Sequence, residues 1–212
     1  MRDLRPIEVT ALDASEFVTA GEVLAGAFQD DPLWVAVIGD PMRRPELLAR
    51  MFAGLTKTTV TARGIAEKTP RLEGVALWLP PARDIRLWDM ARSGFLLPRF
   101  VLSLPRQDRQ QLMAVLGQVG ERKKTLMREP HWYVSTIGVD ADYQGQGLGL
   151  ALMGHGISRA DRGDTPIYLE TEAEENVGFY QHLGFEVIEV FTPEGLDAPM
   201  WLMTRRPRSL RP

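Results

Sequence analysis

The sequence contains no cysteine and only three histidines. Without cysteine there can be no disulfide framework, no thiolate nucleophile and no cysteine-based metal site. His131, His155 and His182 lack the spacing of metal ligands, so we predict no metal. No apolar run approaches the length of a transmembrane helix, and the first residues are too charged for a signal peptide. We therefore predict a cytoplasmic protein without a membrane partner.

Neither sign of charge is in large excess, because the sequence has 25 basic and 28 acidic residues and a net charge of −3. This balance argues against nucleic acid and anionic membranes as general partners. A length of 212 residues, with 44% apolar and 25% charged residues, is typical of one globular domain. No internal repeat or low-complexity segment divides the chain.

Apolar spacing, turn residues and helix caps predict a mixture of helices and strands. Asp13 is the predicted N-cap of the first helix, with Glu16 completing a variant capping box, and Gly184 is a predicted C′ glycine. We predict strands at 5–10, 64–68, 73–79, 132–139, 166–171, 185–191 and 200–204, and helices at 13–28, 43–60, 106–127, 144–162 and 176–183, with a further helix between 84 and Pro98. This order makes an α+β or mixed α/β domain.

A glycine-rich loop follows the predicted strand at 132–139 and opens a helix. Its residues are Gln144, Gly145, Gln146, Gly147, Leu148 and Gly149. Such a loop points unpaired backbone N–H groups at one spot, and the helix dipole adds positive charge there. This arrangement suits a phosphate. The alternative is a glycine-rich turn that binds nothing.

The known glycine loops differ in spacing. The dinucleotide pattern G-x-G-x-x-G fails here because position 150 is Leu, and the P-loop pattern fails because no Lys follows the glycines. What remains is Gln144-x-x-Gly147-x-Gly149, which resembles the pyrophosphate loop of the GCN5-related N-acetyltransferase (GNAT) superfamily.

A second stretch strengthens this resemblance. Asn176-Val177-Gly178-Phe179-Tyr180-Gln181-His182-Leu183-Gly184-Phe185 is similar to the N-x-x-F-Y-x-x-L-G-F segment of the same superfamily. The closest pattern is that of puromycin N-acetyltransferase-like members, through Glu129-Pro130, Thr136-x-Gly138-Val139, Leu169-Glu170-Thr171 and Trp201-x-Met203-Thr204-Arg205. The match is dense from about 129 to 207 and thin before that.

The resemblance implies a GNAT fold, with a twisted, mostly antiparallel sheet of about seven strands and an extra helix pair before the fourth strand. It implies direct acetyl transfer from acetyl-CoA to a primary amine of a small molecule, through a tetrahedral intermediate and without a metal. Its cofactor-binding residues would be Ile137, Val139, Gln144, Gly145, Gln146, Gly147, Leu148, Gly149, Leu150, Asn176 and Tyr180. Backbone groups of Ile137 and Val139 would bind the pantetheine arm and thioester, and a homodimer is possible.

Two side chains are the candidate catalytic residues. The resemblance implies that Tyr180 is the general acid for the departing thiolate; otherwise it is a packed helix tyrosine. A phenol of pKa ~10 is a weaker acid than a thiol of pKa ~8.5, which favours a hydrogen bond that strengthens on sulfur. Glu170 lies on the strand beside the loop strand and is the candidate base, or else a structural partner for an Arg or a backbone N–H. Asn176 would cap its helix and contact the cofactor.

The acceptor site is the least defined part of the hypothesis. Asp30, Asp31 and Trp34 lie in the predicted first inter-helix loop and suit a cationic amine with apolar bulk, or else serve as turn residues. Trp88 and Phe95, in the helix pair, contact either an apolar substrate or the core. Glu172, Glu174 and Glu175 are predicted to form an exposed loop face.

Three functions therefore stay open: acetylation of a small amine, acetylation of a peptide or protein amine, and a non-catalytic sensor of acyl-CoA. We predict one GNAT domain over 1–207, in which 84–127 is a helical insertion and 129–204 is the cofactor-binding and catalytic half. Residues 208–212 are predicted to form a frayed tail.

Overall fold

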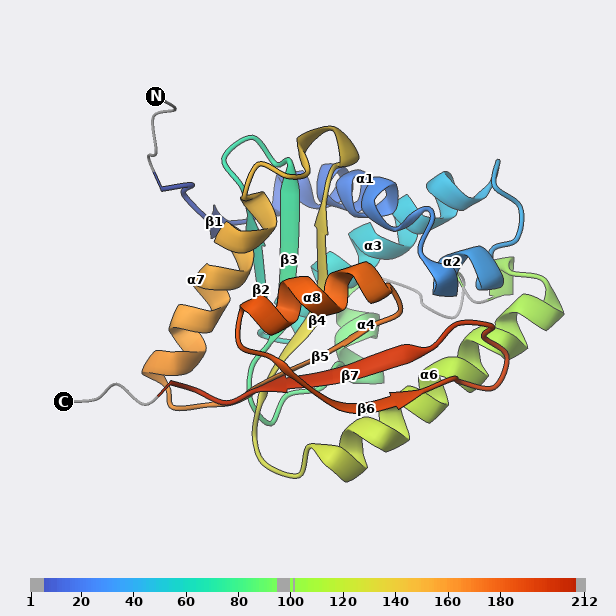
Figure 1. Cartoon of the computed structure of the whole chain (residues 1–212). Coiled ribbons are helices and arrows are strands. Elements are labelled where there is room, and N and C mark those ends of the chain that lie inside the picture. Colours follow the sequence, from blue (N-terminus) through green and yellow to red (C-terminus); the bar gives the residue numbers. More distant parts are fainter. Residues whose placement is uncertain (1–5, 95–99, 101, 209–212) are drawn as a thin grey trace.

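The computed structural model describes residues 6–94, 100 and 102–208. In this part of the chain one sheet contains seven strands in the order β1-β2-β3-β4-β5-β7-β6 (Figure 1). The strands are β1 (Thr10–Ala11), β2 (Ile65–Lys68), β3 (Gly74–Leu79), β4 (Trp132–Val139), β5 (Ile167–Thr171), β6 (Glu186–Phe191) and β7 (Met200–Arg205). Only β4 and β5 pair in parallel. The predicted mixed, mostly antiparallel fold class is thus confirmed.

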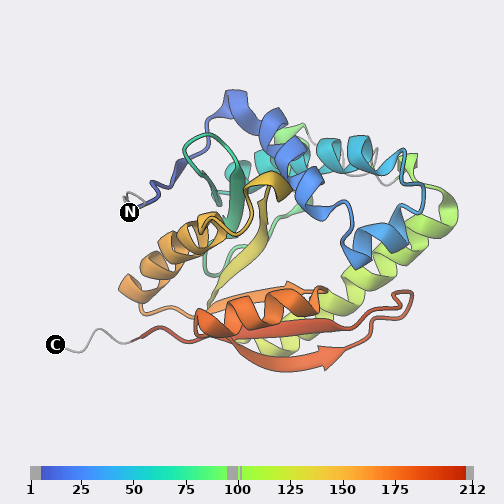
Figure 2. The ribbon, with the colours of Figure 1, turned by 45° about the horizontal axis from the view of Figure 1, so that its top comes forward.

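Helices cover both faces of this sheet (Figures 1 and 2). They are α1 (Phe17–Phe28), α2 (Pro32–Val37), α3 (Arg44–Thr61), α4 (Leu87–Ser93), α6 (Arg106–Leu126), α7 (Leu148–Arg162) and α8 (Glu174–His182). The predicted helices at 43–60 and 106–127 and the predicted end of the loop helix agree with these bounds within one residue. The predicted capping box is also present, because Glu16 accepts a hydrogen bond of 2.9 Å from the Asp13 N–H.

The sheet separates two hydrophobic cores. Val75 and Leu77 of β3 contact the core formed with α1, α3 and α6, whereas Ala76 and Trp78 contact the core formed with α7 and α8. Successive strand residues point to opposite faces, so both sets are buried. All six residues of β3 are buried, which explains why its sequence has no polar residue.

The β4 and β5 strands diverge after a short contact. They pair only at Trp132 with Ile167 and at Tyr133 with Tyr168, although β4 continues to Val139. The backbone groups on this side of the far half of β4 are therefore not used by β5. The tertiary structure thus opens the sheet at its centre, between the glycine loop and α8.

Two predicted elements need correction. The strand predicted at 5–10 is only Thr10–Ala11, because β1 pairs with Lys68 and Glu67, and Lys68 is the last residue of β2. Residues 6–9 extend beyond the partner strand and have no ladder to join, and residue 5 lies outside the described residues. The predicted loop after α1 contains the short helix α2.

The helix predicted before Pro98 is described only as α4, Leu87–Ser93, and the predicted residue Phe95 lies outside the described residues. No helix in the described ranges has the length and apolar character needed to cross a membrane. The predicted frayed tail, 208–212, is described at Arg208 only.

Candidate active site

A cleft of about 580 Å³ lies at the divergence of β4 and β5. Its walls come from the end of β4, the glycine loop, the first turn of α7, and α8. The lining residues are Ala27, Phe28, Asp30, Asp31, Pro32, Ile137, Gly138, Val139, Tyr143, Gln144, Gly145, Gly147, Leu148, Gly149, Leu150, Ala173, Glu175, Asn176, Phe179 and Tyr180. Most of the predicted cofactor-binding residues therefore share one cleft.

The glycine loop presents free backbone donors to this cleft. In the part of the chain that is described, the N–H groups of Gly147, Leu148, Gly149 and Leu150 have no protein acceptor, and the first N–H bonded in α7 is that of Ala151. Gly147 has a φ of +83°, and a Cβ built there would meet nothing closer than 3.9 Å. The loop can therefore approach a ligand closely with its backbone. Four aligned donors at a helix N-terminus fit a diphosphate.

The end of β4 contributes a second set of donors. Asp140 N–H donates to Glu73 O at 2.8 Å, on the side of β4 that faces β3. Because antiparallel pairing alternates along a strand, the N–H groups of Ile137 and Val139 point to the opposite side, where β5 has separated. Gln144 Nε2 donates to Val139 O at 3.2 Å and ties the loop to this strand end.

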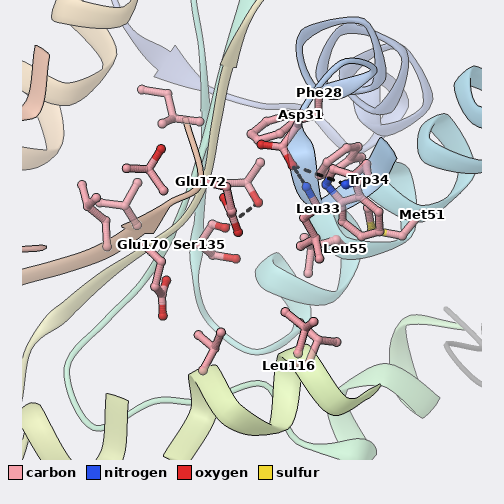
Figure 3. A pocket seen from close by; sticks show the side chains of 18 of the residues that line it. Phe28, Asp31, Leu33, Trp34, Met51, Leu55, Leu116, Ser135, Glu170 and Glu172 are labelled. Atoms are coloured by element: carbon pink, nitrogen blue, oxygen red, sulfur yellow. Dashed lines mark hydrogen bonds between the residues drawn. The ribbon is translucent and has the colours of Figure 1, made fainter. Parts of the chain in front are cut away.

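A second cavity, of about 350 Å³, adjoins the cleft on the α1, α3 and α6 side of the sheet (Figure 3). Its walls are mostly apolar. They include Leu33, Trp34, Met51, Phe52, Leu55, Met90, Phe100, Leu112, Val115, Leu116, Val119 and Met200. The polar groups in its wall include Thr58, Tyr133, Ser135, Thr136, Thr171 and Asn176, together with three carboxylates.

The two cavities meet at Tyr180. Phe28, Asp31, Ile137, Asn176 and Tyr180 line both of them. Tyr180 is 7% exposed, and burial followed by the charge of Glu172 raises the pKa of its phenol. The phenol therefore stays protonated at neutral pH and is available as a hydrogen-bond donor at this junction.

Asp31 reaches the junction because it caps a helix. Its Oδ1 accepts hydrogen bonds from Leu33 N–H at 3.0 Å and Trp34 N–H at 3.4 Å. Asp followed by Pro at the first helical position is a standard helix start. Burial raises the pKa of Asp31 to about 6, against the lowering effect of those two hydrogen bonds.

Glu170 and Glu172 point to the same side of β5, since they are two residues apart at the end of a strand. Burial raises the pKa of Glu172 to about 8, with further increases from the charges of Asp31 and Glu170. Burial also raises the pKa of Glu170 to about 6, against the neighbouring Tyr133, Lys123 and Tyr168, which lower it. Within the described chain, Glu170 Oε1 is buried without a hydrogen-bond partner.

The structure corrects several residue-level predictions. Glu172 does not lie on an exposed loop face but lines the apolar cavity, whereas Glu174 and Glu175 are exposed in the first turn of α8. Asn176 is not a helix cap, because α8 begins at Glu174 with Ala173 as its N-cap. The helix starts earlier because the Thr171 hydroxyl accepts a hydrogen bond from Ala173 N–H and turns the chain directly after β5.

Other candidates are separated from the cavities that we expected them to line. Trp88 is 69% exposed and does not line the apolar cavity, since it lies on the solvent side of α4, whereas Met90 lines that cavity. Gln146 is exposed and outside the residues that line the cleft. Asp30 lines the cleft at the glycine loop, Trp34 lines the apolar cavity, and Asp31 lines both.

Glu172 is the main functional candidate that sequence reasoning missed. A signal was present, because period-two alternation places residue 172 on the side that residue 170 faces. The prediction instead placed Glu172, with Glu174 and Glu175, on an exposed loop face between the strand and the next helix.

Comparison with known proteins agrees with this geometry. The family model described as "Acetyltransferase (GNAT) family" matches residues 76–185, just over half of the chain. A Corynebacterium glutamicum structure described as "histone acetyltransferase HPA2 and related acetyltransferase" is similar, with 24% identity, a TM-score of 0.68 and coverage of 96% of this chain and 98% of that one.

Two insect structures share the fold as well. Arylalkylamine N-acetyltransferase 2 from Aedes aegypti has 17% identity, a TM-score of 0.59 and coverage of 96% of this chain and 100% of that chain. Polyamine N-acetyltransferase from Drosophila melanogaster has 15% identity, a TM-score of 0.62 and coverage of 94% and 99%.

Proposed function

This chain belongs to the acetyltransferase (GNAT) family, and from that membership we propose that it transfers the acetyl group of acetyl-CoA to the primary amine of a small molecule. The observation that carries the proposal is the junction of two cavities at Tyr180. One cavity has a diphosphate-sized set of backbone donors, and the other has apolar walls with carboxylates. A donor and an acceptor molecule can therefore meet beside one phenol.

The cofactor end uses backbone groups. The N–H groups of Gly147 to Leu150 would hold the diphosphate, and the free edge of β4 at Ile137 and Val139 would bind the pantetheine arm. Acetyl-CoA supplies an acyl thioester, which is the electrophile of the reaction. The Val139 N–H would stabilise the negative charge that develops on the thioester oxygen.

Tyr180 would donate a hydrogen bond to the thioester sulfur. Its raised pKa makes full proton transfer to a thiolate less favourable than for an ordinary phenol. We infer that this hydrogen bond strengthens as the sulfur gains charge. Rate enhancement then comes from this bond, the Val139 N–H and the orientation of the two reactants.

The amine must lose a proton before it attacks. The sequence predicts Glu170 as the proton acceptor, and its buried Oε1 without a partner in the described chain supports a site for a polar group there. Water leading to this carboxylate would serve the same purpose. The alternative acceptor, a peptide or protein amine, would have to insert its terminus into the apolar cavity.

The finer expectations stay predictions. They are the puromycin N-acetyltransferase-like pattern, the homodimer, the cytoplasmic location and the single domain over 1–207. We propose that α4 and α6 of the 84–127 segment build the acceptor wall, because Met90, Leu112 and Leu116 line that cavity.

An amine-panel assay that follows the release of free CoA tests the proposal. Antibiotics, polyamines, arylalkylamines and peptides serve as acceptors, and calorimetry measures acetyl-CoA binding separately. We expect tight acetyl-CoA binding and amine-dependent CoA release with a small-molecule amine. Acetyl-CoA binding with no release by any amine would favour the sensor function, and absence of binding would mean that the loop is misassigned.

A further inference from the structure

In the acceptor cavity the acidic side chains and the apolar helix walls lie at different ends. Asp31 and Glu172 are near the cofactor cleft, and Asp31 itself lines both cavities. A third carboxylate, Glu170 of β5, also lines the cavity, so its acidic side chains all come from β5, from the residue after it and from the start of α2. The walls formed by α3, α4 and α6 contribute no acidic side chain among the described residues; apart from Thr58, whose hydroxyl donates to Gly54 O, they contribute apolar side chains: Met51, Phe52, Leu55, Met90, Leu112, Val115, Leu116 and Val119. A bound cation would therefore find carboxylates at one end of the cavity and apolar side chains at the other.

Asp31 and Glu172 come from different parts of the chain and face one space. Asp31 is held at the start of α2 by the hydrogen bonds that it accepts, and Glu172 directly follows β5. Figure 3 shows both side chains on the same side of the cavity, with Glu170 lower and Leu116 across from them on α6. Of the two β5 carboxylates, Glu172 is the one whose charge acts on both Asp31 and Tyr180.

We propose that Asp31 and Glu172 together bind the ammonium group of a monoamine whose remaining body is apolar, and that the cavity excludes polyamines. This proposal rests on the proposed function and names its substrate class. At the end formed by α3, α4 and α6, a second ammonium group would lie against leucine, methionine and valine side chains, because the described residues of these helices contribute no carboxylate to the lining. An unpaired buried charge is strongly unfavourable, whereas an alkyl or aryl body fills the same space favourably.

The reaction balances with this pair as the proton acceptor. The bound ammonium loses one proton to the carboxylate pair, the C–N bond forms, and the C–S bond breaks. The second amine proton ends on the CoA sulfur, and the first leaves the carboxylates for solvent. In this scheme the pair replaces Glu170, the base predicted from the sequence, as the first proton acceptor.

Octylamine and octanediamine form a matched pair for the test. They have the same chain length, but only the diamine has a second charge at the far end. We expect kcat/KM for CoA release to be roughly ten- to hundredfold higher for octylamine, as for a site that leaves a buried charge unpaired. Equal values, a preference for the diamine, or a preference for peptide amines would overturn the inference while leaving the proposed function intact.

A gain-of-function variant makes the test sharper. Leu116 is 47% exposed and lines the far wall, so Leu116→Glu is compatible with folding and adds a carboxylate there. We expect this variant to reduce or reverse the preference for octylamine, measured as the ratio of the two kcat/KM values. An unchanged ratio would contradict the proposed direction of binding.

The carboxylate pair is tested by Glu172→Gln, with the exposed Glu174→Gln as the matched control. We expect Glu172→Gln to raise KM for octylamine roughly ten- to hundredfold, the size of a charged hydrogen bond, while acetyl-CoA affinity stays unchanged. A larger effect for Glu170→Gln than for Glu172→Gln would overturn the assignment. If acetyl-CoA binds and neither amine releases CoA, the proposed function fails together with this inference.

Discussion

At the scale of single residues, Tyr180 is the clearest test of the chemistry. Replacing it with Phe removes one hydroxyl from the junction of the two cavities and leaves the packing of the ring in place. We expect kcat to fall by roughly a hundredfold, the size of a typical acid–base contribution. The measurement is steady-state CoA release, with acetyl-CoA affinity determined by calorimetry.

Tyr143→Phe is the control for this variant, because Tyr143 lines the same cleft beside the glycine loop but not the acceptor cavity. Its turnover should remain close to that of the unaltered protein. Equal turnover in the Tyr180→Phe variant would remove this phenol from the mechanism.

The acidic residues show how far residue-level prediction reaches. Asp31 and Glu170 were predicted as functional, and both line the acceptor cavity. Glu172 was predicted to be exposed because it follows the strand, yet it lines the cavity together with Asp31, whose charge raises its pKa. Sequence shows residue types and alternation, whereas the position of Asp31 opposite β5 depends on how α1 and α2 pack.

At the scale of elements, the glycine loop predicts a specific loss of cofactor binding. Gly147→Asp places a carboxylate where the diphosphate would lie, at about 4 kcal/mol of repulsion for charges ~4 Å apart near a protein surface. We expect acetyl-CoA affinity to fall by a hundredfold or more, on the order of that repulsion. Calorimetry measures the affinity, and circular dichroism verifies that the variant is folded.

Two controls separate charge from backbone strain. Gly147→Ala has the same unfavourable φ of +83° without the charge, so its loss should be much smaller. Gly154→Asp adds the same charge to α7, where a new Cβ meets nothing within 4 Å, and should bind acetyl-CoA normally. Retained affinity in Gly147→Asp would contradict the assignment of the loop.

The packing of α7 on the sheet depends on another glycine. A Cβ at Gly156 would come within 2.1 Å of the Trp78 ring, which is fully buried. We expect Gly156→Ala to lower the free energy of unfolding by about 1–3 kcal/mol through overpacking. Urea denaturation measures the free energy of unfolding, and Gly154→Ala is the control, because a Cβ at Gly154 meets nothing within 4 Å. If Gly156→Ala is as stable as the unaltered protein, the Trp78 ring can move aside.

The errors in element prediction have local causes. The short helix α2 has a recognisable start in Asp31-Pro32, but its six residues are too few for an apolar period to show. The strand β1 begins only at Thr10, because Thr10 pairs with Lys68 and Lys68 is the last residue of β2. Strand length is a property of the pair, so it is not determined by either segment alone.

At the scale of the whole molecule, the acceptor carboxylates link stability to pH. Asp31, Glu170 and Glu172 have pKa values raised to about 6, 6 and 8, above their ordinary values of 3.8 and 4.5. The folded state therefore binds more protons than the unfolded state between about pH 4 and 8. Stability from these groups is present at low pH and is lost as the pH rises through this window.

Glu172→Gln should flatten the upper part of this dependence. We expect Tm of the unaltered protein to fall relative to the variant between pH 6 and 8, because only in the unaltered protein does the folded state hold a proton on Glu172 that the unfolded state has released. His131, whose pKa is lowered by burial, acts in the opposite direction near pH 6.5 and is common to both proteins. Parallel curves for the two proteins would contradict the assigned burial of Glu172.

The sequence by itself determined the mixed fold class, the strand–loop–helix unit at 132–162 and the family resemblance, because alternation, helix period and glycine spacing are local properties. Only the tertiary structure decided that β4 and β5 separate after Tyr133, that a second cavity lies beside α6, and that Asp31 and Glu172 line this cavity together. These features depend on contacts between segments far apart in the chain, and no local pattern encodes the distance between them.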